Sequence, residues 1–395
     1  MKVKKKHIDK LELLFVLFMS FALMPDVLAV GGHSLKGMYL MFIVLVGLMA
    51  NKKRLVKPDK AIVGLFAYGI LVSLFASITW GIDRLFFNYC FGFFVIILIL
   101  SLGTKYTEDD WLYMLQCVWW LLVACVLIND IKQSYRFVEY FQYRLNHPYI
   151  VTLVNGGCNI EACWIGILSL SFYRVKKRFI PVAVALGFSL LYASRVGMIA
   201  TFVVILIFAY GRLPEDTKRR LFNRRVIFTI LGITALVMLL VAGIGGGFFL
   251  QVFSRFADIG HDPGSLGRLA MWYYVPQTIM EYPFGVGLGN VMPALESVSH
   301  LIYEDGNLHN IYMQMFIETG IIGGTLYLFV VVTWCIRNIK RAFVSPIVGM
   351  LCIYFVLALF QFRGGDTIFF CLLGIYLNTI KNKQRGTYSE KKISN

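Results

Sequence analysis

Long apolar runs, separated by short polar segments, cover most of this chain of 395 residues. A helix needs about 20 mainly apolar residues to cross the hydrocarbon of a bilayer. The pattern predicts about twelve transmembrane helices, of which the second, seventh, eighth and twelfth are short. The predicted segments are 11–30, 35–50, 61–80, 86–103, 111–129, 149–173, 178–193, 196–211, 226–250, 311–336, 345–362 and 367–380. We therefore expect an all-α polytopic membrane protein with a single transmembrane domain over residues 1–380.

Two of the polar segments between these runs are long, 130–148 and 251–310. In the longer one, Gly267 to Tyr282 has the pattern of an amphipathic helix that lies along a membrane face. The large loop is thus expected to contain amphipathic helices. After the last apolar run, residues 381–395 are rich in Lys, Ser and Asn, which predicts a disordered basic tail.

The composition agrees with a membrane protein, since 58% of the residues are hydrophobic and 15% are charged. Soluble domains have about 45–50% apolar and about 25% charged residues. All eight cysteines lie in apolar runs, so no structural disulfide is expected. Cysteines and histidines do not cluster at metal-ligand spacing. We accordingly expect no metal site and no cofactor.

The net charge of +16 follows the predicted topology. With a cytoplasmic N-terminus, 29 of the 38 Lys and Arg residues fall on the cytoplasmic side and nine outside. Cytoplasmic segments carry such an excess in membrane proteins. We expect both termini in the cytoplasm and 251–310 outside. The basic excess also suits contact with anionic lipids, and nucleic acid is not an expected partner.

A few polar residues in or beside the apolar runs need an explanation, because such residues are costly in a bilayer and often functional. Arg195 lies between two short runs, at the predicted outer tip of a hairpin. It either binds an anion or extends its charged end to the membrane surface. Glu161 lies deeper, and we expect it to be structural or to line a cavity.

The stretch from His309 to Val332 combines polar residues with a membrane helix. His309 and Asn310 precede the apolar run, and Glu318 lies nine residues after His309. A histidine changes charge near neutral pH, which suits a site that meets a lipid-linked substrate. The alternative is that His309 and Asn310 only cap the helix.

A glycine-rich turn, Pro283 to Gly289, resembles a phosphate-binding loop. Nucleotide-binding loops of this kind connect a strand to a helix. This turn follows a predicted helix and leads into no strand, which excludes a nucleotide site.

Arg195, Arg268 and His309 all fall on the outer side in the predicted topology. Two guanidinium groups and an imidazole suit a compact anion site. A guanidinium binds a phosphate through two parallel hydrogen bonds and keeps its charge at any physiological pH.

Three motifs resemble the family of O-antigen ligases and O-antigen polymerases, membrane enzymes of bacterial surface polysaccharide assembly. The first is Ser194-Arg195-Val-Gly197. The second runs from Arg268 through Trp272 to Pro283-Phe-Gly-Val-Gly287, with Tyr282 where the family commonly has histidine. The third is His309-Asn310-x-Tyr-x-Gln314-x-x-x-Glu318-x-Gly320-x-x-Gly323. Together they span roughly residues 185–335 in the family's order.

The resemblance implies transfer of a sugar chain from undecaprenyl pyrophosphate on the outer face of the cytoplasmic membrane, without metal and with inversion. Arg195 and Arg268 would bind the pyrophosphate, and His309 would accept the proton of the attacking hydroxyl. Asn310 and Glu318 would support them, and the 251–310 loop would form part of the active site. Partners would be the lipid-linked oligosaccharide and the bilayer, with a chain-length regulator and a flippase as further candidates.

The product would be a capsular, exo- or O-antigen polysaccharide. We favour a polymerase because the Lys-, Ile- and Phe-rich composition suits an organism without lipid A. The alternatives are a ligase that transfers the glycan to lipid A–core and, from another class, a polysaccharide flippase or transporter. Transporters usually contain internal repeats and broken helices, and the sequence has no evident repeat.

Overall fold

The computed structural model describes residues 9–25, 29–30, 33–34, 36–50, 60–102, 106–143, 148–175, 179–211, 213, 263–303, 306–362 and 364–393. The predicted segment 226–250 and the first part of the predicted 251–310 loop lie outside these residues. Within them, regular structure is helical apart from a two-residue pair of strands, β1 (Ala29–Val30) and β2 (His33–Ser34), which pair antiparallel.

Every other predicted apolar segment contains a helix, which confirms the all-α polytopic class. The helices are α1 (Lys10–Leu23), α2 (Gly37–Ala50), α3 (Lys60–Trp80), α4 (Arg84–Leu102), α5 (Glu108–Lys132), α6 (Ser134–Gln142), α7 (Gly157–Ser169) with the 3-10 helix η1 (Leu170–Arg174), α8 (Phe179–Leu191), α9 (Arg195–Tyr210), α13 (Pro263–Glu281), α14 (Val291–Ser299), α15 (Ile311–Ala342), α16 (Pro346–Leu357) and α17 (Thr367–Ile393).

Two predicted boundaries were wrong for physical reasons. The segment 149–173 does not begin as a helix, because Gly156 and Gly157 adopt positive φ values of 103° and 81° and α7 starts only there. The basic tail is not disordered up to its end, since α17 continues to Ile393. The short helix α6 was not predicted, and α14 lies in the loop expected to contain amphipathic helices but had no predicted range of its own.

Among the described residues, four helices are long and apolar enough to cross a membrane by themselves: Ile62–Trp80, Arg84–Leu102, Glu108–Lys132 and Ile311–Ala342. Apolar side chains on their outer surface face away from the protein. On α3, for example, Phe75 is 76% exposed and Ile78 is 87% exposed. Large exposed apolar surfaces of this kind are stable in lipid and unfavourable in water.

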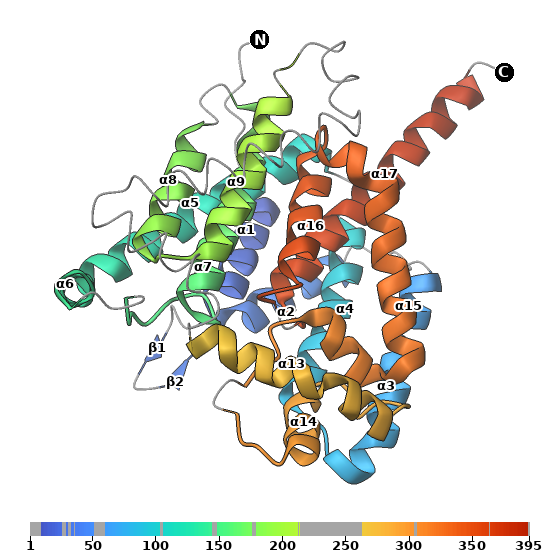
Figure 1. Ribbon diagram of the computed structural model, residues 1–395. Helices are drawn as coiled ribbons and strands as arrows, with labels where there is room; N and C mark the ends of the chain where they lie inside the picture. Colours follow the sequence, from blue (N-terminus) through green and yellow to red (C-terminus); the bar gives the residue numbers. More distant parts are fainter. Residues whose placement is uncertain are drawn as a thin grey trace.

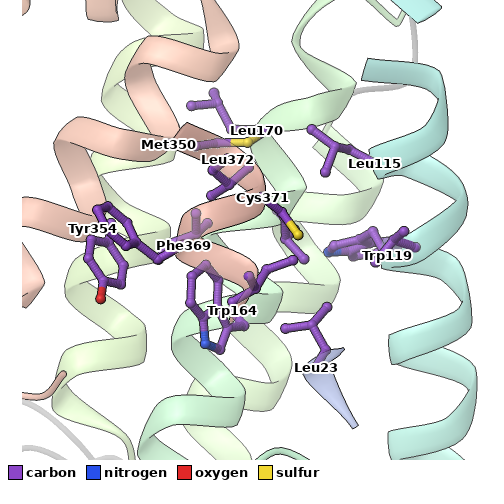
Figure 2. Close-up of a cluster of buried hydrophobic side chains, with 14 of the residues drawn as sticks. Leu23, Leu115, Trp119, Trp164, Leu170, Met350, Tyr354, Phe369, Cys371 and Leu372 are labelled. Carbon is purple, nitrogen blue, oxygen red and sulfur yellow. The ribbon is translucent and has the colours of Figure 1, made fainter. Parts of the chain in front are cut away.

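The core of the bundle is aromatic and lies where α5, α7, α16 and α17 meet (Figure 2). Tyr354 stacks on Phe369 with ring centroids 4.4 Å apart, and Trp164 lies 5.8 Å from Tyr354. Trp119 donates a hydrogen bond of 2.9 Å from its indole N–H to the carbonyl of Ile165. These contacts fix α7 against α16 and α17, the helices that support the region described next.

The segment before α15 lies at one end of the bundle. In Figure 1, α13, α14 and the β1–β2 pair lie at the end opposite to the C-terminal part of α17. Helix α13 contains the predicted helix 267–282, and Met271 and Val275 on its inner face pack with α14 and α15. Helix α14 buries Val291 and Leu295 and exposes Ser297. This end of the molecule carries the candidate site.

Candidate functional site

Arg268 lies near the start of α13 and reaches the end of α16. Its Nη1 donates a hydrogen bond of 3.2 Å to the carbonyl of Phe360, in the turn after α16. Carbonyl groups at a helix C-terminus carry partial negative charge, which favours a guanidinium there. One turn further along α13, the indole N–H of Trp272 donates to the carbonyl of Leu308 at 2.9 Å. Together, Arg268 and Trp272 attach α13 to the segments on both sides of the site.

His309 precedes α15 in a left-handed conformation with φ of 56°, which is uncommon for a residue with a Cβ atom. Asn307 stabilises this conformation. Its Oδ1 accepts a hydrogen bond from the backbone N–H of His309 at 3.0 Å, and its Nδ2 lies 3.4 Å from the imidazole Nδ1. The imidazole is half-buried. His309 therefore lies outside the helix and does not cap it.

Asn310 is the residue that caps α15. Its Oδ1 accepts hydrogen bonds from the backbone N–H groups of Tyr312 and Met313, both at 3.0 Å. These N–H groups have no partner within the helix, so a side-chain acceptor stabilises the helix start. The capping interpretation is confirmed for Asn310, and no described contact gives it a second role.

The start of α15 meets the same turn that binds Arg268. The N–H of Ile311 donates to the carbonyl of Ala358 at 3.0 Å, and the hydroxyl of Tyr312 donates to the carbonyl of Phe355 at 2.7 Å. Since Arg268 binds the carbonyl of Phe360, the end of α16 and the turn that follows it hold both α13 and α15. The structure thus attaches the segments that carry Arg268 and His309 to the same turn, although the two residues are far apart in the sequence.

Arg195 is placed by different elements. It is the first residue of α9, after Ser194, whose hydroxyl accepts a hydrogen bond from the N–H of Gly197 at 3.1 Å. The Arg195 side chain is half-buried. Helix α9 packs against α7, α8 and α16. Helix α9 therefore shares α16 as a neighbour with α13 and α15, and the hydrogen bonds given above between the end of α16, α13 and α15 do not involve Arg195.

Glu318 is buried inside the protein, one helical turn after Gln314. Its Oε1 accepts hydrogen bonds from Gln314 Nε2 at 2.7 Å and from the backbone N–H of Gly289 at 2.9 Å. The described hydrogen bonds of Glu318 thus go to the glycine-rich turn and not to His309. Its position is that of a residue that holds the turn in place.

Helix α15 is broken at Gly320, whose φ is 71° and ψ −178°. The break removes backbone hydrogen bonds, and other groups replace them. The N–H groups of Val286 and Gly287 donate to the carbonyls of Ile317 and Glu318, at 3.1 and 2.9 Å. In the opposite direction, the N–H of Ile321 donates to the carbonyl of Pro283 at 2.9 Å. Unpaired backbone groups are unfavourable at membrane depth, so this exchange permits the break.

The break and the turn fit together because both contain glycine. A Cβ atom at Gly285 would lie 2.6 Å from the carbonyl oxygen of Glu318, and one at Gly320 would lie 2.5 Å from the carbonyl oxygen of Pro283. No side chain fits at either position. The glycine-rich turn is therefore a backbone clasp, by which we mean residues 283–289 bound to the break in α15.

The clasp also explains why the turn is not a phosphate-binding loop. In such a loop, successive backbone N–H groups point at the ligand. Here the N–H groups of Leu288 and Gly289 are bound by Ser73 Oγ at 3.0 Å and Glu318 Oε1 at 2.9 Å. With Val286 and Gly287 bound to α15, protein acceptors occupy the donors that a phosphate would need.

A polar cavity of about 710 Å³ lies at the same end of the molecule, which we name the chamber. Its lining includes Lys36, Arg84, Asn307 and Gln314. Asn307 also contacts His309, so the chamber wall adjoins the imidazole. We did not single out Lys36 or Arg84 as site residues from the sequence. The available signal was their charge, since both belong to the nine basic residues predicted outside.

Glu161 is buried in α7 and fully used in structural contacts. Its Oε2 accepts from the backbone N–H groups of Leu153 and Val154, at 3.0 and 3.1 Å. The hydroxyl of Tyr192 lies 2.8 Å from Glu161 Oε1 and 2.7 Å from Asp130 Oδ2. Glu161 thus joins α5, α7 and the segment before α7, which agrees with the structural interpretation.

The fold defines this chain as a polytopic integral membrane protein. Residues 180–328 match the model of the O-antigen ligase family, which confirms the resemblance to O-antigen ligases and polymerases. The matched segment contains all three sequence motifs, from Ser194 to Gly323. No curated protein matches the chain. The family match supports a role in membrane glycan processing, of the type that O-antigen ligases and polymerases carry out.

Proposed function

We propose that the chain is a metal-independent membrane glycosyltransferase that polymerises undecaprenyl-pyrophosphate-linked repeat units into surface polysaccharide. The reaction would take place on the outer face of the cytoplasmic membrane. The observation that carries this proposal is the joint attachment of Arg268 and the His309 segment to the turn that follows α16. Both belong to the segment that matches the family.

In the proposed reaction, a hydroxyl oxygen of the acceptor sugar attacks C1 of the donor sugar. The bond between C1 and the diphosphate oxygen breaks, and undecaprenyl diphosphate leaves with the electron pair. His309 accepts the proton of the attacking hydroxyl. Attack from the face opposite to the leaving group inverts the configuration at C1. A positioned general base contributes about 10²–10⁴-fold to a rate.

The arginines act on the leaving group. Negative charge increases on the diphosphate as the bond breaks, and a fixed cation stabilises it more in the transition state than before. Removing one preorganised donor of this kind costs about 3–4 kcal/mol. Arg268 is held in place by the carbonyl of Phe360, and Arg195 would approach from the start of α9.

The test replaces Arg268 with lysine and His309 with alanine. Lysine keeps the charge but loses the planar pair of donors, so Arg268→Lys should reduce polymer formation by at least about 100-fold, the effect of one lost donor. His309→Ala should stop transfer while the donor still binds. The measurements are polymer ladders in cells and an assay with purified lipid-linked repeat units, with and without EDTA. The chelator should have no effect.

Matched controls exist in the same region. Arg136→Lys changes a half-buried arginine of α6, whose Nε donates a hydrogen bond to the hydroxyl of Tyr135 at 3.0 Å. His300→Ala changes an exposed histidine with the same φ of 56° as His309. Both variants should give normal ladders. Normal ladders from Arg268→Ala combined with His309→Ala, at wild-type protein levels, would show that the chemistry lies elsewhere.

A ligase is the second candidate, because the matching family model describes O-antigen ligases. A ligase would use the same donor and the same three residues but would transfer the glycan to lipid A–core. Offering purified lipid A–core and lipid-linked repeat units to the same preparation separates the two, since the acceptor that becomes extended identifies the reaction.

One observation favours the transporter alternative, namely the break in α15. Broken helices in transporters leave backbone groups for the transported solute or ion. In this chain the clasp occupies those groups.

We predict that Glu161→Gln, which is nearly isosteric, folds and keeps most transfer activity in the ladder assay. Loss of activity at normal protein levels would favour proton-coupled transport instead.

A further inference from the structure

An apolar groove adjoins the chamber, and Gly364 and Gly365 line both. The groove has a volume of about 340 Å³ and lies between α3, α4, α15 and α17. Both glycines line both cavities. A Cβ atom at Gly364 would lie 2.2 Å from the hydroxyl of Tyr89, so no side chain fits there. The polar chamber and the apolar groove thus adjoin each other at these two glycines.

The groove has the shape of a site for a long chain. One stripe of α15 lines it at every fourth residue, Ile311, Met315, Thr319, Gly323, Tyr327 and Val331. At about 1.5 Å per helical residue, this stripe is about 30 Å long. The hydrocarbon core of a bilayer is also about 30 Å thick. A stripe of this length can hold an extended apolar chain along α15.

The chamber has groups that suit a charged, hydroxylated head group. Lys36 and Arg84 line it, and among the described residues neither side chain takes part in an ion pair. Two carboxylates, Asp83 and Asp366, also line it. Asp83 Oδ1 accepts from the backbone N–H of Leu85 at 2.7 Å, and Asp366 Oδ2 accepts from the hydroxyl of Tyr354 at 3.2 Å. Lys36 and Arg84 are the groups of the chamber that would bind a diphosphate, which carries several negative charges.

Gln314 adds an acceptor at the other side of the chamber. Its Nε2 is bound to Glu318 at 2.7 Å, which directs its Oε1 away from that carboxylate. Gln314 is 1% exposed, and within the described part of the chain no donor binds its Oε1. A buried acceptor without a donor is unfavourable. A sugar hydroxyl in the chamber would satisfy it.

We propose that the chamber and groove bind the acceptor substrate, a glycan linked through a diphosphate to a single isoprenoid chain. The chain would lie in the groove, the diphosphate beside Lys36 and Arg84, and the sugars in the chamber. Asn307 lines this space and contacts the imidazole of His309, so the far end of a short oligosaccharide in the chamber would lie next to the proposed base. This inference rests on the proposed function. It names the site at which the second substrate of that reaction, the acceptor, binds.

A single narrow groove also favours an acceptor lipid with one chain over one with several chains. A lipid with a single chain fills one groove with one tail, whereas lipid A carries several acyl chains on one head group. The donor diphosphate is assigned to Arg195 and Arg268, which do not line the chamber. A second, separate site for a lipid diphosphate is what a polymerase needs, because both of its substrates carry one.

The test counts bound lipid on the purified full-length chain by native mass spectrometry, with undecaprenyl diphosphate as the probe. Wild type should bind two molecules. Gly69→Leu places a side chain in the groove, where its Cβ would meet Leu288 only at 3.4 Å, an ordinary contact. Gly69→Leu and Arg84→Gln should each weaken binding of one of the two molecules at least tenfold.

The matched controls keep the same chemistry outside the cavities. Gly64→Leu changes the same helix at a position with open space around its Cβ, and Lys132→Gln removes an exposed cation at the end of α5. Both should bind two molecules with unchanged affinity. If Gly69→Leu and Arg84→Gln behave like these controls, or if wild type binds a single molecule, the proposal is wrong.

A measurement on wild type alone guards against misfolded variants. An undecaprenyl diphosphate analogue with a photoreactive group on its chain should crosslink to α3, α4, α15 or α17. Excess phosphatidylglycerol should leave this labelling unchanged, and full competition would overturn the isoprenoid assignment. Two bound lipids together with normal polymer from His309→Ala would contradict the proposed function while leaving this site intact.

Discussion

The backbone conformation of His309 allows the effect of conformational strain on stability to be measured separately from the role of the imidazole in the reaction. A residue with a Cβ atom in an unfavourable backbone region costs about 1–3 kcal/mol, whereas glycine adopts positive φ freely. His309→Gly should therefore unfold at the same temperature as wild type or a higher one, yet lose transfer as completely as His309→Ala. Thermal denaturation in detergent, together with the polymer assay, measures both effects.

The comparison for this variant is His300→Gly, because His300 has the same φ of 56°. This variant should unfold at the same temperature as wild type or a higher one, and it should keep full transfer activity. If His309→Gly also retained transfer, the imidazole would have no part in the reaction, and the histidine would matter only for the shape of the loop.

Single residues differ in how far the sequence determines their role. The capping role of Asn310 follows from its position before an apolar run, because a cap acts on the next two or three residues. The attachment of Arg268 to the carbonyl of Phe360 joins residues far apart in the chain, and no local pattern encodes it. Arg84 was counted as an outer charge, but its place in the chamber depends on the packing of helices that are far apart in the sequence.

At the scale of elements, the clasp makes a sharp prediction about glycine. Gly285→Ala would place a Cβ 2.6 Å from the backbone of α15, at a φ of 92°. Overpacking and backbone strain each cost about 1–3 kcal/mol. We expect this variant to lose at least about 2 kcal/mol of stability or to fail to accumulate, as followed by thermal denaturation in detergent and by protein levels.

The control for this prediction is Gly267→Ala in α13, where a Cβ meets nothing within 4 Å. Alanine is a better helix former than glycine by about 0.8–1 kcal/mol, so this variant should be as stable as wild type or more stable. Equal stability of Gly285→Ala and Gly267→Ala would mean that the clasp does not hold α15.

The membrane helices could be predicted because hydrocarbon imposes a length and a composition that are visible in a single stretch of sequence. The break in α15 could not be placed in this way. Gly320 lies in an apolar run that contains other glycines, and the partners of its neighbours belong to residues 283–287. Helix α14 was missed because it is only nine residues long and mixes small, polar and apolar residues.

For the whole molecule, the charge distribution predicts that α13 and α14 face the outside of the cell and the C-terminal tail faces the cytoplasm. The two regions lie at opposite ends of the bundle (Figure 1). A cysteine placed at Ser297, in a variant without the native cysteines, should react with an impermeant maleimide in intact cells. A cysteine at Lys340, in the last turn of α15, should react only after the membrane is opened.

The reverse labelling pattern would overturn both the topology and the proposed reaction, since the lipid-linked substrate would then be on the wrong side. Protection of both positions would place them inside a larger assembly. Protein levels and membrane insertion of each variant provide the internal control for these measurements.

The clasp also constrains the order in which the protein is assembled. Its donors belong to residues 286–289, but the acceptors that bind them include the carbonyls of Ile317 and Glu318. During synthesis the turn leaves the ribosome before its partners exist. The clasp can form only after the first half of α15 has been made. The turn after α16, which holds α13 and α15, is synthesised later still. The proposed catalytic centre is therefore among the last parts of the molecule to be completed, after most of its transmembrane helices have been synthesised.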